Sequence, residues 1–525
     1  MKRILLPMAL LLWTLMACQN QPNPIAPTEE LPAVQLEVKG TFAPLDGRDV
    51  MPKEAINAQV LALLQERDEF RWSFVDAYVV WSAAMQTDSL LSVGYQPLGF
   101  QGIDERMHEI DVEDPAWRAT REALIQFIVD ETNRLHPDDP VEAEDILAYG
   151  EKPLPYLNVQ VRDYEVIAQL RRIEQVRYAE PMGYGGDVDA TRSGKGCGNG
   201  PLASLPTSDF TTVSPGAKVS WNLYEHNIPS AWSYSTGDNI TVGLIDTGLD
   251  PAQDKLNSEF TSGWSGSRFR QKFGTFVTGW WWWASIDGPD DDCGHGTQMA
   301  GVIAAPRSNE GSTVGVAYQS NLVSYRGTDD VVINESNEKN GVSDALYQLG
   351  FRSDVKIISM SIGDVFSSGQ VADAVRYAYG RGKLIFAAAG TSLSWTSWYG
   401  VIFPANMGET VAVTGIETGS PMNRCDVCHD GAAVDFVVVM QDRRNADRRP
   451  LTLANSGNTP SRTGGSSVAT ATTAGVAALV WATNPNLSRA QVMLRLKDAS
   501  DFYPSRSSSF GWGKIDALEA VAPWL

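Results

Sequence analysis

Continuous apolar runs alternate with amphipathic stretches over the second half of the chain. The apolar runs have the length of strands and lie at residues 240–245, 321–325, 356–360, 383–388 and 410–414. Helical spacing of apolar residues follows His295 and recurs at residues 342–349, 371–379 and 467–481. Strands that are apolar throughout belong to parallel sheets covered on both faces. The pattern therefore predicts an α/β fold in which a parallel sheet lies between two helical layers.

The first half of the chain has a mixed pattern. Apolar residues recur at helical spacing in 56–64 and 117–135, alternate as in a strand at 157–161, and return to helical spacing at 166–173. A further strand-like segment at 176–181 closes this part. We expect a smaller α+β domain here.

Composition marks the boundaries between the units. Glycine, serine and threonine dominate after Gly183, which predicts a linker at 183–220. The smaller domain then occupies residues 38–182, and the larger α/β domain occupies residues 221–525. With 525 residues, the chain is too long for one ordinary core.

The N-terminus has the shape of an export signal. Lys2 and Arg3 precede an apolar run at 4–16 that is short for a membrane span. The sequence Leu-Met-Ala-Cys that ends at Cys18 resembles the lipobox of bacterial lipoproteins, which implies a signal peptide at 1–17 and a lipidated Cys18. The alternative is an ordinary signal peptide cut near Ala17. Residues 18–37 are rich in proline and predict an extended tether.

Charge and composition narrow the partners. The formal net charge of -21 argues against binding to nucleic acid or electrostatic docking on anionic lipid. No later stretch is expected to span a bilayer. We expect an exported protein that is lipid-anchored to a bacterial membrane through Cys18 or released after processing.

Three glycine-marked motifs carry the candidate chemistry. They are Ile-Asp-Thr-Gly at 245–248, Gly-His-Gly-Thr at 294–297 and Gly-Ser-Ser-Val-Ala at 465–469. The carboxyl ends of strands and the N-termini of helices face each other in such sheets, so the motifs can meet. A serine hydroxyl needs an imidazole to take its proton and a carboxylate to orient that imidazole. The motifs predict acyl transfer.

The region from about Trp221 to Leu525 resembles the catalytic domain of the subtilisin-like serine proteases, the subtilases. The three motifs occur in that family's order, and Gly-Trp-Gly-Lys-Ile-Asp-Ala at 511–517 resembles its closing segment. The resemblance implies a secreted serine endopeptidase on a subtilisin-like parallel sheet. It assigns the nucleophile to Ser467, the general base and acid to His295, and the orienting carboxylate to Asp246.

The same resemblance implies where a protein or peptide substrate binds. An extended substrate would pair with one strand edge and face an opposite wall of the pocket for the residue before the cut. The edge consists of Ser361, Ile362 and Gly363, and the wall consists of Ala388, Ala389 and Gly390.

Two residues near the nucleophile raise questions. Thr391 stands where the family usually has an asparagine whose amide donates to the oxyanion, and losing such a donor in a subtilisin costs about 10²- to 10³-fold in turnover. Thr391 can still donate through its hydroxyl. Ser466 is a rival nucleophile, although the motif frame favours Ser467. The alternative function is a catalytically impaired binding protein with the subtilase fold.

The end of the first domain resembles the inhibitory propeptide of subtilases. The resemblance implies an intramolecular inhibitor that is cut away between Pro181 and Trp221. The alternative is an accessory domain that is never removed. If the lipid remains with the propeptide, processing releases the protease from the membrane.

The cysteines and the acidic residues offer further sites. Residues 425–429, Cys-Asp-Val-Cys-His, match the attachment motif for c-type haem but are expected in a surface loop. Besides Cys18 there are four cysteines, which allow three pairings. We favour Cys425 with Cys428, and Cys197 with Cys293.

No cofactor is required for the predicted chemistry. Asp287 and the acidic run 290–292 could bind a structural calcium ion, but their spacing is not that of a known calcium loop, and no metal is assigned. The four tryptophans at 280–283 are read either as residues buried alternately in a strand or as an exposed platform.

Overall fold

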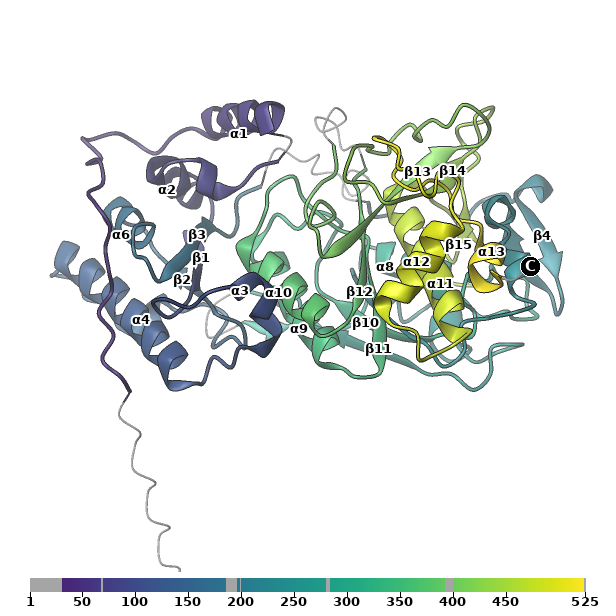
Figure 1. The fold of residues 1–525 in the computed structure, drawn as a ribbon, viewed down its shortest axis with the longest axis horizontal. Coiled ribbons are helices and arrows are strands. Elements are labelled where there is room, and N and C mark those ends of the chain that lie inside the picture. Colours follow the sequence, from purple (N-terminus) through teal and green to yellow (C-terminus); the bar gives the residue numbers. More distant parts are fainter. Residues whose placement is uncertain are drawn as a thin grey trace, which may run out of the picture.

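The computed structural model describes residues 31–67, 69–185, 196–198, 200–279, 284–391 and 400–523. Two units, each with its own sheet, lie side by side (Figure 1). The predicted signal peptide, Cys18 and the four tryptophans lie outside the described residues, as does most of the predicted tether.

The N-terminal unit is built on an antiparallel sheet in the order β2-β1-β3. Val93 in the central strand lies opposite Leu157 on one side and Ala179 on the other. The strands are β1 (Leu90–Tyr95), β2 (Tyr156–Gln160) and β3 (Val176–Pro181). The helices are α1 (Lys53–Arg67), α2 (Ala77–Met85), α3 (Ile103–Arg106), α4 (Pro115–Leu135), α5 (Ala143–Ile146) and α6 (Tyr164–Leu170).

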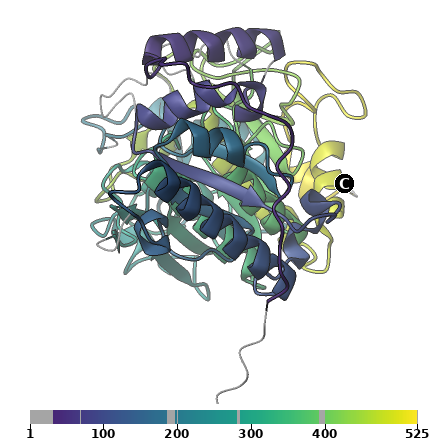
Figure 2. The same ribbon diagram turned by 90° about the vertical axis from the view of Figure 1, so that its left-hand side faces the viewer.

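The two faces of this small sheet have different neighbours. Helices α4 and α6 lie on its outer face, which is turned toward the viewer in Figure 2. The inner face lies against α10 (Gly369–Gly380) of the larger unit (Figure 1). The small sheet is therefore packed between the helices of its own unit and helix α10 of the larger unit.

The larger unit contains a seven-stranded parallel sheet in the order β14-β13-β12-β11-β6-β10-β7. This sheet confirms the predicted fold class. Its strands are β6 (Thr241–Asp246), β7 (Arg270–Gly274), β10 (Asn321–Arg326), β11 (Val355–Met360), β12 (Leu384–Ala388), β13 (Thr410–Glu417) and β14 (Phe436–Gln441).

Helices cover both faces of the large sheet. Val242 and Leu244 in β6 pack into the core beneath α8 (His295–Ala304) and α11 (Gly465–Ala482). Ile245 points to the other face, where α9 (Ser336–Phe351) and α10 lie. The smaller helices α7 (Ile228–Ala231), α12 (Arg489–Asp498) and α13 (Ala517–Val521) complete the α11 side.

The segment predicted as a linker contains secondary structure near its end. A hairpin of β4 (Phe210–Val213) and β5 (Ala217–Ser220) packs on the larger unit. Ala217 and Val219 are buried, while Lys218 exchanges backbone hydrogen bonds with Ser312 and Val314. Burial of Ala217 and Val219, at alternate positions, suffices to pack this strand on the larger unit, although the surrounding glycine- and serine-rich sequence indicates a loop.

Short antiparallel pairs complete the fold. They are β8 (Val277–Thr278) with β9 (Ser285–Ile286), and β15 (Leu451–Thr452) with β16 (Ser461–Arg462).

Helix α11 has the length and apolar composition of a membrane span, which the sequence analysis did not expect after the N-terminal run. Of this helix, 89% is buried inside the protein. Its apolar surface is therefore covered by the sheet and by α8.

Candidate active site

The end of β6 and the start of α8 bring an aspartate and a histidine together. Asp246 is the last residue of β6, and His295 is the first residue of α8. Asp246 Oδ1 lies 2.7 Å from His295 Nδ1 and also accepts the backbone N–H of Thr247. Both side chains are buried. With its Nδ1 proton held by the carboxylate, a neutral His295 keeps Nε2 free to accept a proton.

A second aspartate fixes the start of α8. Asp291 accepts the backbone N–H of Gly294 at 2.6 Å, and both the backbone N–H and the hydroxyl of Thr297 at 2.8 and 2.7 Å. The hydroxyl of Thr247, next to Asp246, also donates to Asp291 at 2.8 Å. The negative charge lies at the N-terminus of a helix, where it is favourable. Asp291 was not predicted as a positioning residue, although an aspartate just before a helix is a usual capping signal.

Charge outweighs burial at His295. Burial is the largest single effect and favours the neutral ring, but the nearby charge and hydrogen bond of Asp246 favour the protonated ring. Asp291 and Asp330 add to the second effect. The pKa of His295 is therefore raised above its ordinary value of 6.5.

The two serines at the start of α11 have different surroundings. Ser467 is partly exposed, and its Oγ donates to the carbonyl of Ser361 at 3.4 Å. Ser466 is 1% exposed. Within the described residues no hydrogen bond joins Ser467 and His295. Such contacts often tighten only when substrate is bound. Exposure favours Ser467 as the reactive hydroxyl.

Thr391 faces the backbone of the nucleophile segment. Its Oγ1 accepts the backbone N–H of Ser466 at 3.3 Å and lies 3.0 Å from Ser466 Oγ. Ser466 Oγ in turn accepts the backbone N–H of Gly390 at 3.3 Å. Gly465 has a φ of +80° and lies so close that a Cβ there would stand 2.9 Å from Thr391 Oγ1. Thr391 thus lies beside the nucleophile segment.

The predicted substrate edge follows β11, and part of it is already paired. The N–H of Gly363 donates to the carbonyl of Val331 at 3.1 Å, and the N–H of Ile333 donates to the carbonyl of Gly363 at 3.3 Å. Val332 and Gly363 therefore form a parallel bridge. An extended peptide can reach these groups of Gly363 only after residues 331–333 move away.

The predicted opposite wall follows β12, the parallel neighbour of β11. Ala388 and Ala389 are buried, and the N–H of Ile402 donates to the carbonyl of Ala389 at 3.0 Å. Gly390 has a φ of +126°, a conformation that side chains rarely adopt. The predicted substrate edge and the predicted opposite wall thus lie at the carboxyl ends of two adjacent strands.

A sequence profile described as the Subtilase family matches residues 237–513, which is more than half of the chain. The chain belongs to the subtilase family. Thermitase from Thermoactinomyces vulgaris is 24% identical over 294 residues, which cover 56% of this subtilase and 92% of thermitase. Subtilisin E from Bacillus subtilis (strain 168) is 27% identical over 323 residues, which cover 61% of this chain and 76% of the relative.

The fold has a counterpart among solved structures. Fervidolysin from Fervidobacterium pennivorans, described as a keratinolytic enzyme related to subtilisin, matches with a TM-score of 0.56 at 16% sequence identity. The match covers 82% of this subtilase and 60% of fervidolysin. This likeness supports the subtilisin-like fold. Family membership makes the chain a serine endopeptidase, a hydrolase that acts on peptide substrates.

The cysteine pairing favoured from the sequence of this subtilase is confirmed. Cys197 is bonded to Cys293, and Cys425 to Cys428. The segment is a turn at the surface, as expected, with Asp426 exposed, but Cys425, Cys428 and His429 point inward and are 2%, 0% and 1% exposed. The disulfide removes two polar thiols, and the carbonyl of Gly400 lies 2.9 Å from His429 Nδ1, so these three side chains can lie inside the protein. With both sulfurs in a disulfide, residues 425–429 do not fit covalent attachment of haem.

The acidic residues before His295 are used within the protein. Arg326 pairs with Asp287, Asp292 and Asp329, and Lys272 pairs with Asp290. Among the described residues, no group of three or more potential metal ligands lies close enough to hold an ion.

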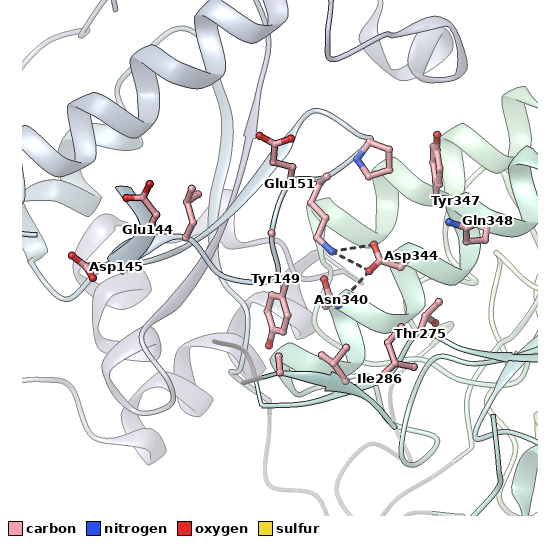
Figure 3. Close-up of a pocket in the computed structure, with 16 residues that line it drawn as sticks. Glu144, Asp145, Tyr149, Glu151, Thr275, Ile286, Asn340, Asp344, Tyr347 and Gln348 are labelled. Carbon is pink, nitrogen blue, oxygen red and sulfur yellow. Dashed lines mark hydrogen bonds and ion pairs between the residues drawn. The ribbon is translucent and has the colours of Figure 1, made fainter. Parts of the chain in front are cut away.

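A cavity of about 1090 Å³ opens between the two units of this subtilase (Figure 3). It is lined by residues 144–153, by α9 and by strands β8 and β9. The ammonium group of Lys152 reaches across to Asp344 at 3.0 Å. No residue of the three motifs lines this cavity among the described residues. The cavity is separate from the candidate active site.

Proposed function

We propose that this subtilase cleaves peptide bonds through an acyl-enzyme on Ser467, with His295 as general base and acid and Asp246 as the orienting carboxylate. The hydrogen bond of 2.7 Å between His295 Nδ1 and Asp246 is the observation that carries the proposal. It holds the imidazole in the tautomer that accepts a proton at Nε2.

The proposed reaction has two balanced steps. Ser467 Oγ attacks the carbonyl carbon while its proton moves to His295 Nε2, and the same proton then passes to the leaving amine as the peptide bond breaks. Water next attacks the ester and gives its proton to His295, which returns it to Ser467 Oγ as the acid leaves. Asp246 stabilises the charged imidazolium in both steps.

Thr391 is the proposed side-chain donor to the oxyanion. A hydroxyl has one proton and two acceptor sites. If Ser466 donates its hydroxyl proton to Thr391, the Thr391 oxygen accepts two bonds, because the Ser466 N–H already donates to it. The Thr391 proton is then free to point at the oxyanion. Gly390 supports this direction by donating to Ser466 Oγ.

The N-terminal unit is the proposed intramolecular inhibitor. The guanidinium of Arg177 in β3 forms two bonds with Asp373 in α10 at 2.5 and 2.9 Å, and the hydroxyl of Tyr178 donates to Asp373 at 2.9 Å. Beside this polar contact, Trp72 stacks on Phe366 with ring centroids 5.8 Å apart. These contacts join the small sheet firmly to the catalytic unit.

One buried lysine connects this contact with the substrate edge. Lys339 Nζ donates to the carbonyls of Met182 at 2.5 Å, Tyr184 at 3.4 Å and Asn334 at 3.5 Å. Asn334 directly follows residues 331–333, which pair with Gly363. The end of the N-terminal unit therefore helps to hold the segment that covers the substrate edge. We propose that removal of this unit frees the edge for substrate.

Lipid anchoring is part of the proposal and rests on the sequence of residues 1–18. A lipid on Cys18 would hold the precursor on a membrane outside the cytoplasm, and the tether would separate it from the folded units. Cleavage between Pro181 and Trp221 would leave the lipid with the N-terminal unit.

A fluorophosphonate probe tests the proposed nucleophile. We expect labelling of the processed wild-type protein and of Ser466→Ala, the latter at a lower rate because Thr391 loses its orienting partner. Ser467→Ala should not be labelled. Labelling that survives in Ser467→Ala would disprove the assignment, and an unlabelled wild type would favour the binding protein over the protease. Mass spectrometry of the new N-terminus shows whether the N-terminal unit is removed.

A further inference from the structure

The turn at residues 425–429, whose Cys425, Cys428 and His429 side chains are buried, lies directly behind Thr391. Thr391 and Cys428 form an antiparallel bridge. The backbone N–H of His429 donates to the carbonyl of Gly390 at 3.0 Å. A Cβ on Gly390 would stand 2.5 Å from His429 Nδ1, so the turn and the pocket wall are in close contact. The motif that resembles a haem site thus belongs structurally to the active-site wall.

His429 binds both ends of the chain segment that begins at Thr391. Its backbone N–H holds Gly390, and its Nδ1 lies 2.9 Å from the carbonyl of Gly400. A carbonyl only accepts, so Nδ1 carries the proton. Burial lowers the pKa of His429, which keeps the ring neutral and leaves Nε2 as an acceptor. One residue therefore holds Gly390 through its backbone and Gly400 through its ring.

The second ring nitrogen of His429 makes no hydrogen bond to the described residues that would stabilise the ring. Nε2 is buried and has no hydrogen-bond partner within the described part of the chain. An apolar side chain would avoid the penalty of burying that nitrogen. The polar contact that distinguishes an imidazole from a leucine here is the bond to Gly400.

The turn itself is anchored on the sheet. The Cys425–Cys428 disulfide closes it, and the N–H of Cys425 donates to the carbonyl of Gly415 in β13 at 3.0 Å. The hydroxyl of Thr414 donates to the carbonyl of His429. These bonds hold His429 in a fixed position relative to β13, and the bond from His429 then holds Gly390.

We infer that Cys428 and His429 are positioning residues that hold Gly390 and Thr391 against the nucleophile segment, so that the Thr391 hydroxyl reaches the oxyanion. This inference rests on the proposed role of Thr391. A threonine hydroxyl is shorter than an asparagine amide and its proton rotates, so its support must be rigid. The turn at 425–429 supplies that support from behind, and Ser466 directs the proton from the front.

Variants of His429 separate positioning from general stability. His429→Leu removes the Nδ1 donor, while His429→Asn places an amide N–H near the same point. Displacing an oxyanion donor should cost a large part of the 10²- to 10³-fold effect of removing one, so we expect His429→Leu to lower kcat by about 10- to 100-fold with little change in KM. His429→Asn should recover most of this loss. An unchanged kcat in His429→Leu would overturn the inference.

His226 offers a matched control. It is also a buried histidine in the catalytic unit; its Nδ1 lies 3.0 Å from the carbonyl of Ile515, and its Nε2 accepts the backbone N–H of Val439 at 3.0 Å. His226→Leu should lower the thermal midpoint but leave kcat within about 2-fold, because only His429 acts on the oxyanion donor. An equal loss of kcat in both variants would mean that His429 has a merely structural role.

A double-mutant cycle gives the decisive readout. Thr391→Val removes the hydroxyl, and residues that act through Thr391 should then have nothing left to position. We expect His429→Leu to cost less than about 3-fold in kcat in the Thr391→Val background. Losses that simply multiply would contradict the inference.

A variant that fails to fold and a wild type that does not react with the probe can each be interpreted. If His429→Leu does not fold, His429→Gln takes its place, because it keeps an amide but displaces it by one methylene; the same loss and the same non-additivity are expected, and an unchanged kcat would overturn the inference. All assays use the full-length chain as produced, with any processing it undergoes. A wild type that does not react with fluorophosphonate contradicts the proposed function itself, whereas an active wild type with a silent His429 contradicts only the inference.

Discussion

At the scale of single residues, the active site depends on how each charged or polar group is supported. His295 lies between the carboxylate of Asp246 and the start of a helix that Asp291 caps. The raised pKa of His295 shows that these carboxylates outweigh the effect of burial. A base of this kind stays protonated at a higher pH than an ordinary imidazole.

The pH dependence of activity follows from this shift. In the proposed mechanism only neutral His295 accepts the proton of Ser467, so activity should rise with pH through the pKa of His295, which lies above 6.5. We expect the acid limb of kcat/KM for a short peptide substrate to have its midpoint above 6.5. The rate of fluorophosphonate labelling should show the same limb. A midpoint clearly below 6.5 would mean that Asp246 does not act on His295 as proposed.

The site residues could be predicted from sequence to different degrees. Asp246, His295 and Ser467 can be proposed from sequence because each lies in a short motif whose spacing is local. Asp291 has a capping signal but no chemistry of its own. The roles of Ser466 and His429 could not be predicted, since each depends on contacts with Gly390 and Thr391, which are distant in sequence.

At the scale of elements, the contact between β3 and α10 is both polar and buried. Glu180 in β3 accepts the N–H of Gly369, the first residue of α10, at 2.7 Å. Burial raises the pKa of Glu180 to about 7, although the charges of Arg171 and Lys339 act against it and Asp373 adds to it. Separation of the units would expose the carboxyl to water and lower its pKa toward the ordinary value of 4.5.

This pKa shift predicts that docking of the N-terminal unit weakens as the pH rises. The Glu180 carboxyl holds its proton more tightly in the docked state than in the separated state. The stabilisation of docking by this protonated carboxyl is therefore complete below pH 4.5 and is lost as the pH rises through about 7. In full-length Ser467→Ala, which should not process itself, hydrogen exchange of β3 should therefore become faster relative to its intrinsic rate over this range. Glu180→Gln should reduce that dependence. An identical pH dependence in the variant would exclude Glu180 as its source.

Elements were predicted best where burial is complete. The apolar runs at 321–325, 356–360 and 383–388 correspond to β10, β11 and β12 within a residue or two. Strand β7 was missed because it lies at the sheet edge and its sequence, Arg-Gln-Lys-Phe-Gly, is half exposed. Strand β1 was missed although it is buried throughout, because Ser92 and Gly94 interrupt its apolar residues and it lies shortly after the apolar helix α2.

At the scale of the whole molecule, the N-terminal unit is the physical link between the predicted lipid and the catalytic unit. We predict that Cys18→Ser moves the precursor from the membrane fraction to the soluble fraction, because the lipid on Cys18 is the proposed anchor. The measurement is fractionation of Ser467→Ala, which keeps the precursor intact, with and without Cys18→Ser. Equal membrane association in both would mean that Cys18 is not the anchor.

The bond between Cys197 and Cys293 gives the position of any cut a second meaning. Cys293 lies two residues before His295, and Cys197 follows the N-terminal unit. A cut on the amino side of Cys197 divides the chain into two molecules. A cut on its carboxyl side leaves two polypeptides that still migrate as one species until a reductant is added. A cut after Cys197 thus leaves the N-terminal fragment attached to the catalytic unit through this disulfide. A pair of gels, with and without reductant, shows whether the two fragments are still joined.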